Sequence, residues 1–414
     1  MLQGLHSTTL SNGARLHVLP TGNHGIVAFE VWASVGSGDE PPAAAGISHL
    51  LEHLMFRGTE DVPDGEFDAV IEAYGVKANA WTWYDTTAYT AIAAVEALDK
   101  IMHLEAARFQ NLRITPEVFE TEQQVVLNER SLTADSDPAV LAQEHLDRLL
   151  FDTGPYAHAV IGDKETIASF TREQVTDWYR QHYAPSELDI FVVGDVQVAD
   201  VEALTRKTFG QLPTATTKRP ERPQSQSYRK GIVDEIQLPV AEPLVMIAWG
   251  RELRSDLKAA ATWKMMSEWL TFSRGGELRN ALEYNQRYAL EQQFYVNDHR
   301  LGHSGLWEAT PREGFDPKDL AKAFYQTMAE LAEKGPSDEA LDAARVRILA
   351  YYAACSTPWL MVRQLGSALH DTGSIDNLVH ELDALRAVTA EDIRALAARL
   401  ANPDESVLLY VMPE

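Results

Sequence analysis

The 414-residue sequence has a single cysteine, Cys355, and comparatively few basic residues. One cysteine excludes an intrachain disulfide and a cysteine-type zinc site, so the fold must depend on its apolar core. Lysine and arginine total 36 against 61 acidic residues, and the resulting net charge of −25 argues against binding to nucleic acid. No stretch approaches the roughly 18 apolar residues of a membrane span, so we expect none.

The first residues, Met1-Leu-Gln-Gly-Leu-His, lack the basic and apolar regions of a secretory signal. We therefore expect a cytoplasmic location. A periplasmic or organellar location is the alternative if a leader has been removed.

Helical and strand patterns alternate without a fixed order along the chain. Asn12-Gly13 is a type I′ turn signal and predicts a hairpin over residues 8–19, and residues 79–93 are rich in threonine and aromatic residues, which predicts a strand. Residues 46–56 and 116–131 predict helices. This mixture predicts an α+β fold, in which helices pack on one face of a mostly antiparallel sheet.

The sequence also shows a weak internal repeat. Thr171 opens a capping box, a helix and then an apolar strand, and the same pattern recurs from Thr389, 218 residues later. Residues 214–230 between the halves are polar and contain prolines, as is typical of a linker. We therefore predict two similar domains, an N-terminal zinc-binding domain over 1–213 and a C-terminal domain without metal over 231–414.

The segment Gly46-Ile-Ser-His49-Leu-Leu-Glu52-His53 places two histidines and an acidic residue at helical spacing. His49 and His53 lie about 40° apart around a helix, and Glu52 lies about 60° to the other side of His49. Two imidazoles at this spacing suit a tetrahedral zinc ion, and a nearby carboxylate can take a proton from water that the metal activates. The alternative is a helix with two solvated histidines and an ion pair.

A catalytic zinc site also needs a third protein ligand. Thr115-Pro116 predicts the start of a helix on which Glu122 and Glu129, seven residues apart, share one face. The spacing alone leaves both glutamates open as the third ligand.

Around this motif the sequence resembles the pitrilysin/insulinase-type zinc peptidases, including their processing-peptidase branch. The order His-x-x-Glu-His is the inverzincin signature. The likeness continues in residues 36–40, 79–82, 126–129 and 192–195, and so covers essentially the whole first half. The resemblance implies two similar α+β domains joined by a linker.

The resemblance also implies one zinc ion per chain, held by His49, His53 and Glu129. Glu52 would then be the general base that activates water, and Glu122 a supporting residue in the second shell of the metal.

Asn79 and Ala80 fall where the family presents an edge strand, to which a peptide substrate adds through main-chain hydrogen bonds. Family members of this length act as dimers that enclose a chamber, which implies a second subunit.

The second half departs from the family pattern. The positions 218 residues after the two histidines are Ser267 and Thr271, so this half has no zinc motif. Active family members carry an arginine and a tyrosine that hold the substrate carbonyl, and the alignment puts Glu283 and Leu290 at those positions. Neither side chain can donate a hydrogen bond to a developing oxyanion. A shifted alignment would offer other donors instead: Arg279, Arg287 or Tyr288.

We therefore expect a zinc-dependent endopeptidase subunit that hydrolyses peptides or unfolded polypeptide segments. Its expected partner is a homologous subunit that lacks the zinc motif but supplies the arginine and tyrosine. The alternative is a non-catalytic assembly or core-type subunit that retains the fold. The presence of Glu52 beside the metal ligands favours the enzyme, because a structural zinc site has no use for a base.

Overall fold

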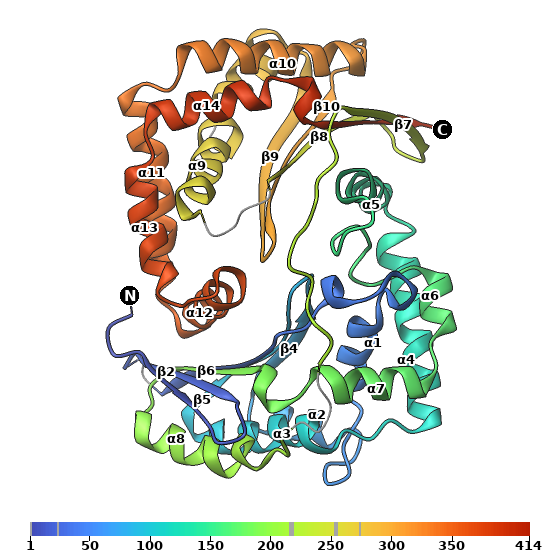
Figure 1. Cartoon of the computed structure of the whole chain (residues 1–414), viewed down its shortest axis with the longest axis vertical. Coiled ribbons are helices and arrows are strands. Elements are labelled where there is room, and N and C mark those ends of the chain that lie inside the picture. The colour runs from blue at the N-terminus through green and yellow to red at the C-terminus, as the bar shows by residue number, and fades with distance from the viewer. Residues whose placement is uncertain (1, 23–24, 215–218, 252–255, 273–274) are drawn as a thin grey trace. The chain divides into compact units, whose positions relative to one another are not determined.

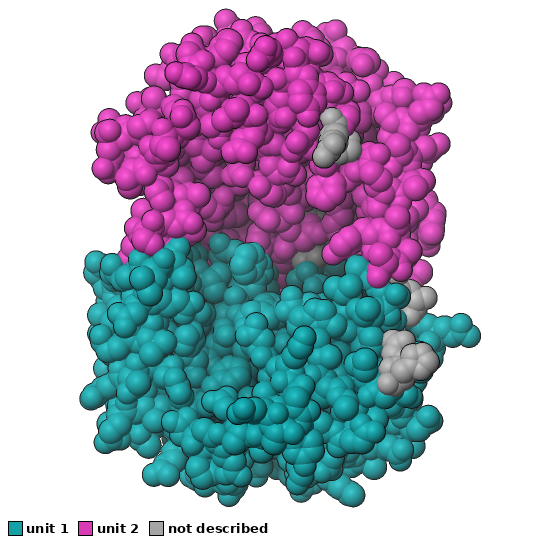
Figure 2. Space-filling view, turned by 180° about the vertical axis from the view of Figure 1, so that it is seen from behind, with its two compact units in different colours: residues 1–133, 158–223, 355–376 teal, residues 134–157, 224–354, 377–414 magenta. Residues whose placement is uncertain are grey.

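The computed structural model describes residues 2–22, 25–214, 219–251, 256–272 and 275–414. The chain forms two compact units, coloured separately in Figure 2. Unit 1 comprises residues 1–133, 158–223 and 355–376, and unit 2 comprises residues 134–157, 224–354 and 377–414. Each unit contains one β-sheet with helices packed against it (Figure 1).

The sheet of unit 1 has the strand order β1-β2-β6-β3-β5-β4. Its strands are β1 (His6–Thr9), β2 (Arg15–Pro20), β3 (Ile26–Ala33), β4 (Lys77–Thr82), β5 (Thr87–Ala94) and β6 (Leu188–Gly194). Only β2 and β6 run parallel, and the other neighbours are antiparallel. The hairpin predicted over residues 8–19 is confirmed by the pairing of β1 with β2.

The sheet of unit 2 has the order β7-β11-β8-β10-β9. Its strands are β7 (Ile232–Leu238), β8 (Leu244–Arg251), β9 (Ala289–His299), β10 (Gly302–Pro311) and β11 (Val407–Pro413). Here β7 and β11 are parallel and the remaining pairs are antiparallel, so the sheet repeats the pairing of β2-β6-β3-β5-β4. The predicted α+β fold with two similar, mostly antiparallel domains is confirmed.

The single strand predicted over residues 79–93 is wrong. The structure has two antiparallel strands there, β4 and β5, joined by a tight turn in which Trp83 N–H donates to Thr86 O at 2.8 Å.

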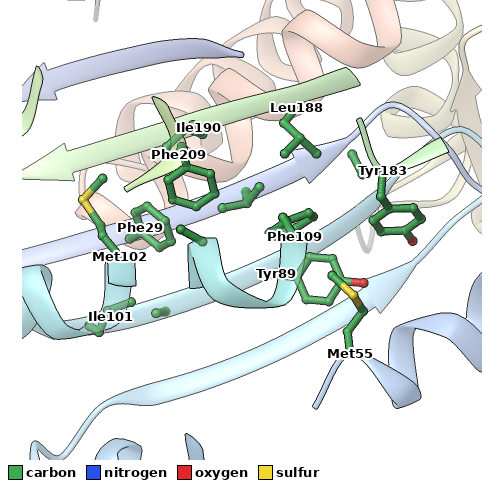
Figure 3. Packing of buried hydrophobic residues seen from close by; sticks show 14 of the residues in the cluster. Phe29, Met55, Tyr89, Ile101, Met102, Phe109, Tyr183, Leu188, Ile190 and Phe209 are labelled. Atoms are coloured by element: carbon green, nitrogen blue, oxygen red, sulfur yellow. The ribbon is translucent and has the colours of Figure 1, made fainter. Parts of the chain in front are cut away.

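The helices of unit 1 enclose one face of its sheet around a large apolar core. They are α1 (Ile47–Leu54), α2 (Glu66–Ala73), α3 (Leu98–Asn111), α4 (Pro116–Glu129), α6 (Lys164–Ser169), α7 (Arg172–His182) and α8 (Val198–Lys207). Figure 3 shows this core, in which the Phe109 ring lies between Tyr89 and Phe209, with centroid distances of 5.4 and 6.2 Å.

The opposite face of the unit 1 sheet is covered by a helix from the second half of the sequence, α12 (Pro358–Thr372), which packs on β3 and β6. Strand β3 alternates, so that Phe29 joins the core while Glu30 and Trp32 point to α12. Gly366 lies against the buried Trp32 ring, where a Cβ atom would come within 2.3 Å of a ring carbon. His370 of the same helix contacts the buried Asp189 at 3.1 Å.

Unit 2 shows the reciprocal arrangement. Helix α5 (Pro138–Phe151), from the first half of the sequence, packs on β7, β8 and β11. The remaining helices of unit 2 are α9 (Leu257–Ser267), α10 (Pro317–Lys334), α11 (Asp338–Ala354), α13 (Asn377–Ala387) and α14 (Ala390–Leu400). The predicted domain boundaries, 1–213, 214–230 and 231–414, describe the two repeated halves of the sequence and stay a prediction. The two compact units do not coincide with these halves, because each unit contains a segment from the other half.

The described part of the predicted linker is anchored at both ends. Arg219 and Arg222 pair with the buried Asp39 of unit 1, at 3.1 and 2.8 Å. Gln226 is buried in unit 2 and donates to Phe151 O at 3.1 Å. Residues 215–218 lie outside the described residues. Among the helices that are described, none has both the length and the apolar character needed to cross a bilayer.

Candidate metal centre

Helix α1 presents the His-x-x-Glu-His motif because its apolar residues face the other way. Leu50, Leu51 and Leu54 are fully buried in the unit 1 core. This orientation brings His49 and His53 to the opposite side, where their rings lie 4.9 Å apart and remain partly exposed.

The start of α1 is fixed by a glycine and a buried carboxylate. Gly46 has φ +96°, and a Cβ atom there would come within 2.4 Å of Ile161 O. The buried Glu40 accepts hydrogen bonds from the N–H groups of Gly46 and Ser48, at 2.7 and 2.8 Å. A carboxylate on these otherwise unpaired N–H groups stabilises the helix end. Burial raises the pKa of Glu40 to about 8.

Glu129, the last residue of α4, lies beside the two histidines because α4 packs directly on α1. Its Oε2 lies 3.2 Å from His53 Nε2, and its Oε1 lies 3.9 Å from His49 Nε2. The helix widens into a π-helical segment, Arg130–Ala134, directly after this residue. Such π-bulges are frequent at functional sites.

The three side chains fit a tetrahedral metal ion. Each offers one ligand atom, and these atoms lie within 4.8 Å of one another. Bond lengths of about 2.0–2.1 Å in a tetrahedral site separate neighbouring ligand atoms by roughly 3.3 Å, close to the 3.2 Å between His53 and Glu129. In the described part of the chain, His49, His53 and Glu129 are the one cluster of this kind.

The two histidines have different electrostatic surroundings. Burial, and then the neighbouring His53, lower the pKa of His49 to about 4, so its imidazole is neutral near pH 7. Burial also lowers the pKa of His53, but the carboxylates of Glu122 and Glu129 outweigh it and raise the value to about 9. A cation at this position would therefore displace a proton from His53.

Glu122 links His53 to an arginine. It lies seven residues, or about two helical turns, before Glu129 on α4. Its side chain is buried, and its Oε2 is 3.5 Å from His53 Nδ1. Arg57 Nε donates to the other carboxylate oxygen at 2.7 Å. Burial raises the pKa of Glu122, but its pairs with His53 and Arg57 outweigh burial and hold it below its usual value. A carboxylate on the second nitrogen is what orients a metal-binding histidine.

Glu52 lies between the two histidines in the sequence and is buried beside them. Thr82 Oγ1, at the end of β4, donates to its Oε2 at 2.6 Å. Burial raises the pKa of Glu52 above its usual value, while the Thr82 hydrogen bond opposes the shift.

Asn79 and Ala80 lie on β4, which is the edge strand of the unit 1 sheet. Asn79 is exposed and Ala80 half-buried. Helix α1 contacts this strand. Peptide binding by these two residues stays a prediction.

In unit 2 the equivalent region holds no metal cluster among the described residues. Ser267 and Thr271 instead hydrogen-bond to the backbone of Phe294 on β9, at 2.7 and 2.8 Å. Arg347, 218 residues after Glu129, forms an ion pair with Glu268.

The described residues that could replace the missing oxyanion donors have other contacts. Arg279 Nε donates to Thr271 O at 2.6 Å, and Tyr288 packs on Phe315 with a centroid distance of 5.0 Å. Glu283 is buried, and Leu290 is 52% exposed. Arg279 is therefore held by a main-chain carbonyl within unit 2, and the ring of Tyr288 packs within the same unit.

The sequence prediction brought together the residues that the structure brings together: His49, His53, Glu129, Glu122 and Glu52. It missed Arg57 and Thr82. Arg57 lies beyond the end of α1, and only the fold shows that it meets Glu122 on α4. Thr82 follows the Asn79-Ala80 stretch, but only the fold shows that its hydroxyl meets Glu52.

Comparison with known families gives two matches along the chain. Residues 20–164 match the family model described as insulinase, peptidase family M16, and residues 169–347 match the peptidase M16 inactive domain. The chain is 32% identical to the zinc protease PqqE of Helicobacter pylori over 213 residues, which are 51% of this chain and 48% of the relative. The match therefore spans about half of that relative's length.

A second relative matches along most of its length. An uncharacterized zinc protease of Streptomyces coelicolor is 25% identical over 401 residues, covering 94% of this chain and 86% of the relative. The crystal structure of a protease from Helicobacter pylori has the same fold, with a TM-score of 0.91, 22% identity and 99% coverage of both chains.

Two further relatives are named as subunits. The probable mitochondrial-processing peptidase subunit beta of Arabidopsis thaliana is 25% identical, covering 78% of this chain and 62% of the relative. The cytochrome b-c1 complex subunit 1 of Caenorhabditis elegans is 29% identical, covering 50% of this chain and 43% of the relative.

Proposed function

Because this chain belongs to peptidase family M16, the insulinase family, we propose that it is a zinc-dependent endopeptidase subunit. The observation that carries the proposal is the convergence of His49, His53 and Glu129, from two helices, beside the buried carboxylate of Glu52. Relatives named zinc proteases support it.

Three of these side chains would hold the zinc ion: His49, His53 and Glu129. When bound there, zinc supplies Lewis acidity, which makes water nucleophilic near neutral pH and polarises a carbonyl. Glu122, held by Arg57, keeps His53 oriented with Nε2 toward the site.

Glu52 would act as the general base and then as the general acid. Its Oε2 is held by Thr82, and Oε1 would take the proton from the attacking water. The same carboxyl group would deliver that proton to the leaving amine of the peptide. Burial raises the pKa of Glu52 above its usual value, which makes the carboxylate a stronger proton acceptor than an exposed glutamate.

Peptide substrate would bind to β4 as an added strand, with Asn79 and Ala80 providing main-chain hydrogen bonds. The place of β4 at the edge of the unit 1 sheet supports this mode of binding. An extended peptide or unfolded segment can pair in this way, whereas a folded chain has no free strand to offer.

We also propose that full activity needs a homologous partner without the zinc motif. The family resemblance puts Glu283 and Leu290 at the positions where active members carry an arginine and a tyrosine. Removing one oxyanion donor typically costs about 10²–10³ in kcat, so the isolated chain should bind zinc and cleave peptides slowly. The relatives named as subunits agree with a two-subunit arrangement.

The departures at Glu283 and Leu290 also favour a second candidate, a non-catalytic assembly subunit. The variant Glu52→Gln separates the two readings. In an enzyme it should keep about one zinc per chain while peptide cleavage falls by about 10²–10⁴-fold. Glu60→Gln, at an exposed position, is the matched control.

Cleavage and zinc content should be measured with the chain alone and with proteins that co-purify from its source. If the wild-type chain with its partner binds zinc but cleaves no peptide, the assembly role is correct and the peptidase role is wrong. If the chain alone is fully active, the partner proposal is wrong.

A further inference from the structure

Thr82 lies on the edge strand of the unit 1 sheet and hydrogen-bonds to the carboxylate of the proposed base. It is the last residue of β4, is buried, and pairs in register with Thr87 on β5. Its hydroxyl donates to Glu52 Oε2 at 2.6 Å. This distance is typical of the strong O–H···O⁻ hydrogen bonds that a charged acceptor makes.

The hydrogen bond restricts a side chain that is otherwise free to turn. A glutamate has three rotatable bonds, and its terminal torsion is broad, so helix α1 alone does not fix the plane of the carboxylate. Holding Oε2 restricts that plane and leaves Oε1 for the reacting water. In the part of the chain that the structure describes, no other protein group donates a hydrogen bond to Glu52.

The position of Thr82 gives this contact a further consequence. A peptide that adds to β4 forms main-chain hydrogen bonds along that strand and restrains it. Since β4 ends at Thr82, the restraint extends to the residue that holds the base.

We propose that Thr82 is a positioning residue, whose hydroxyl holds Glu52 in its reactive orientation and couples that orientation to the occupancy of β4. The inference rests on the proposed peptidase function. A merely structural threonine would instead contribute only to packing at the end of the strand.

Thr82→Val tests the inference because valine keeps the shape and removes the hydroxyl. A lost hydrogen bond to a charged group should lower kcat by about 10–100-fold and change KM little. Thr82→Ser should retain kcat within about threefold. Both variants should keep the zinc content and affinity of the wild type, which is a readout independent of turnover.

Thr87→Val is the matched control. It removes the hydroxyl of the cross-strand neighbour, which donates to Val35 O at 3.0 Å rather than to Glu52. We expect kcat within about threefold of the wild type. Melting temperatures of all variants show whether they fold, and Thr82→Ala is a second hydroxyl-free variant if Thr82→Val unfolds.

The effect should also depend on Glu52. In a Glu52→Asp background the carboxylate is one methylene shorter, which moves it away from the hydroxyl, so Thr82→Val should cause less than a threefold further loss. An equal loss in both backgrounds, an equal loss in Thr82→Ser, or a wild-type kcat in Thr82→Val would each overturn the inference while leaving the peptidase function intact. An inactive wild type with its partner would overturn both.

Discussion

Glu122 offers a test of the metal centre that needs no substrate. Glu122→Gln keeps the shape of the side chain and removes its charge. The wild-type carboxylate contacts His53 Nδ1 at 3.5 Å with one oxygen and accepts from Arg57 with the other at 2.7 Å. An amide has one oxygen, so it can serve only one of these two donors.

We expect zinc affinity to fall by about 10–100-fold, as is typical when a metal-binding histidine loses its carboxylate partner. This range corresponds to about 1.4–2.7 kcal/mol of binding free energy. Two effects contribute. His53 loses the carboxylate that orients its ring, and the site loses a negative charge that favours binding of the zinc cation.

The dissociation constant is measured by competition with a chelating dye at pH 7. Glu120→Gln is the matched control, because Glu120 lies two residues earlier on the same helix and is exposed. An affinity of Glu122→Gln within threefold of the wild type would refute the proposed role of Glu122.

Three further predictions concern stability. Gly366→Ala forces a Cβ atom against the buried Trp32 ring and should lower the free energy of unfolding by about 1–3 kcal/mol, as measured by urea denaturation. Burial raises the pKa of Glu30 from 4.5 to about 7 in the folded protein. The buried, protonated carboxyl therefore contributes fully to the free energy of unfolding below about pH 4.5, and this contribution is lost as pH rises through 7. Glu30→Gln should therefore gain about 3 kcal/mol relative to the wild type between pH 5 and pH 8, and equal pH profiles would contradict this assignment. Thr171→Ala removes the N-cap of α7 and should cost about 1 kcal/mol, whereas an unchanged melting temperature would show that the capping box contributes nothing.

The sequence predicted those parts of the site that lie within one helix or recur at a fixed offset. The spacing of His49 and His53 gave one ligand pair, because a helix repeats regularly. The capping boxes at Thr171 and Thr389 are both present, as the 218-residue repeat predicted. The choice of Glu129 over Glu122 came from family resemblance, since the two residues share a helix face and only the packing of α4 against α1 separates their roles.

The remaining features depend on tertiary structure. The turn at Trp83–Thr86 was missed because its residues include strong strand formers and neither glycine nor proline. The packing of α12 on β3 could not be predicted from periodicity, because the pattern of a helix does not indicate which sheet the helix will cover. The burial of Glu30 on β3 is explained only by the tertiary structure, which places Trp32 and Arg363 beside its carboxylate.

The exchange of α5 and α12 between the two sequence halves affects how the chain can be divided. A single backbone cut near residue 216 would leave each fragment with a helix embedded in the other fragment's sheet. The two fragments would remain bound to each other in native buffer and would separate only in denaturant. A gene fragment ending at residue 213 would expose Trp32 and Glu30, so recombinant work on either half needs both halves expressed together.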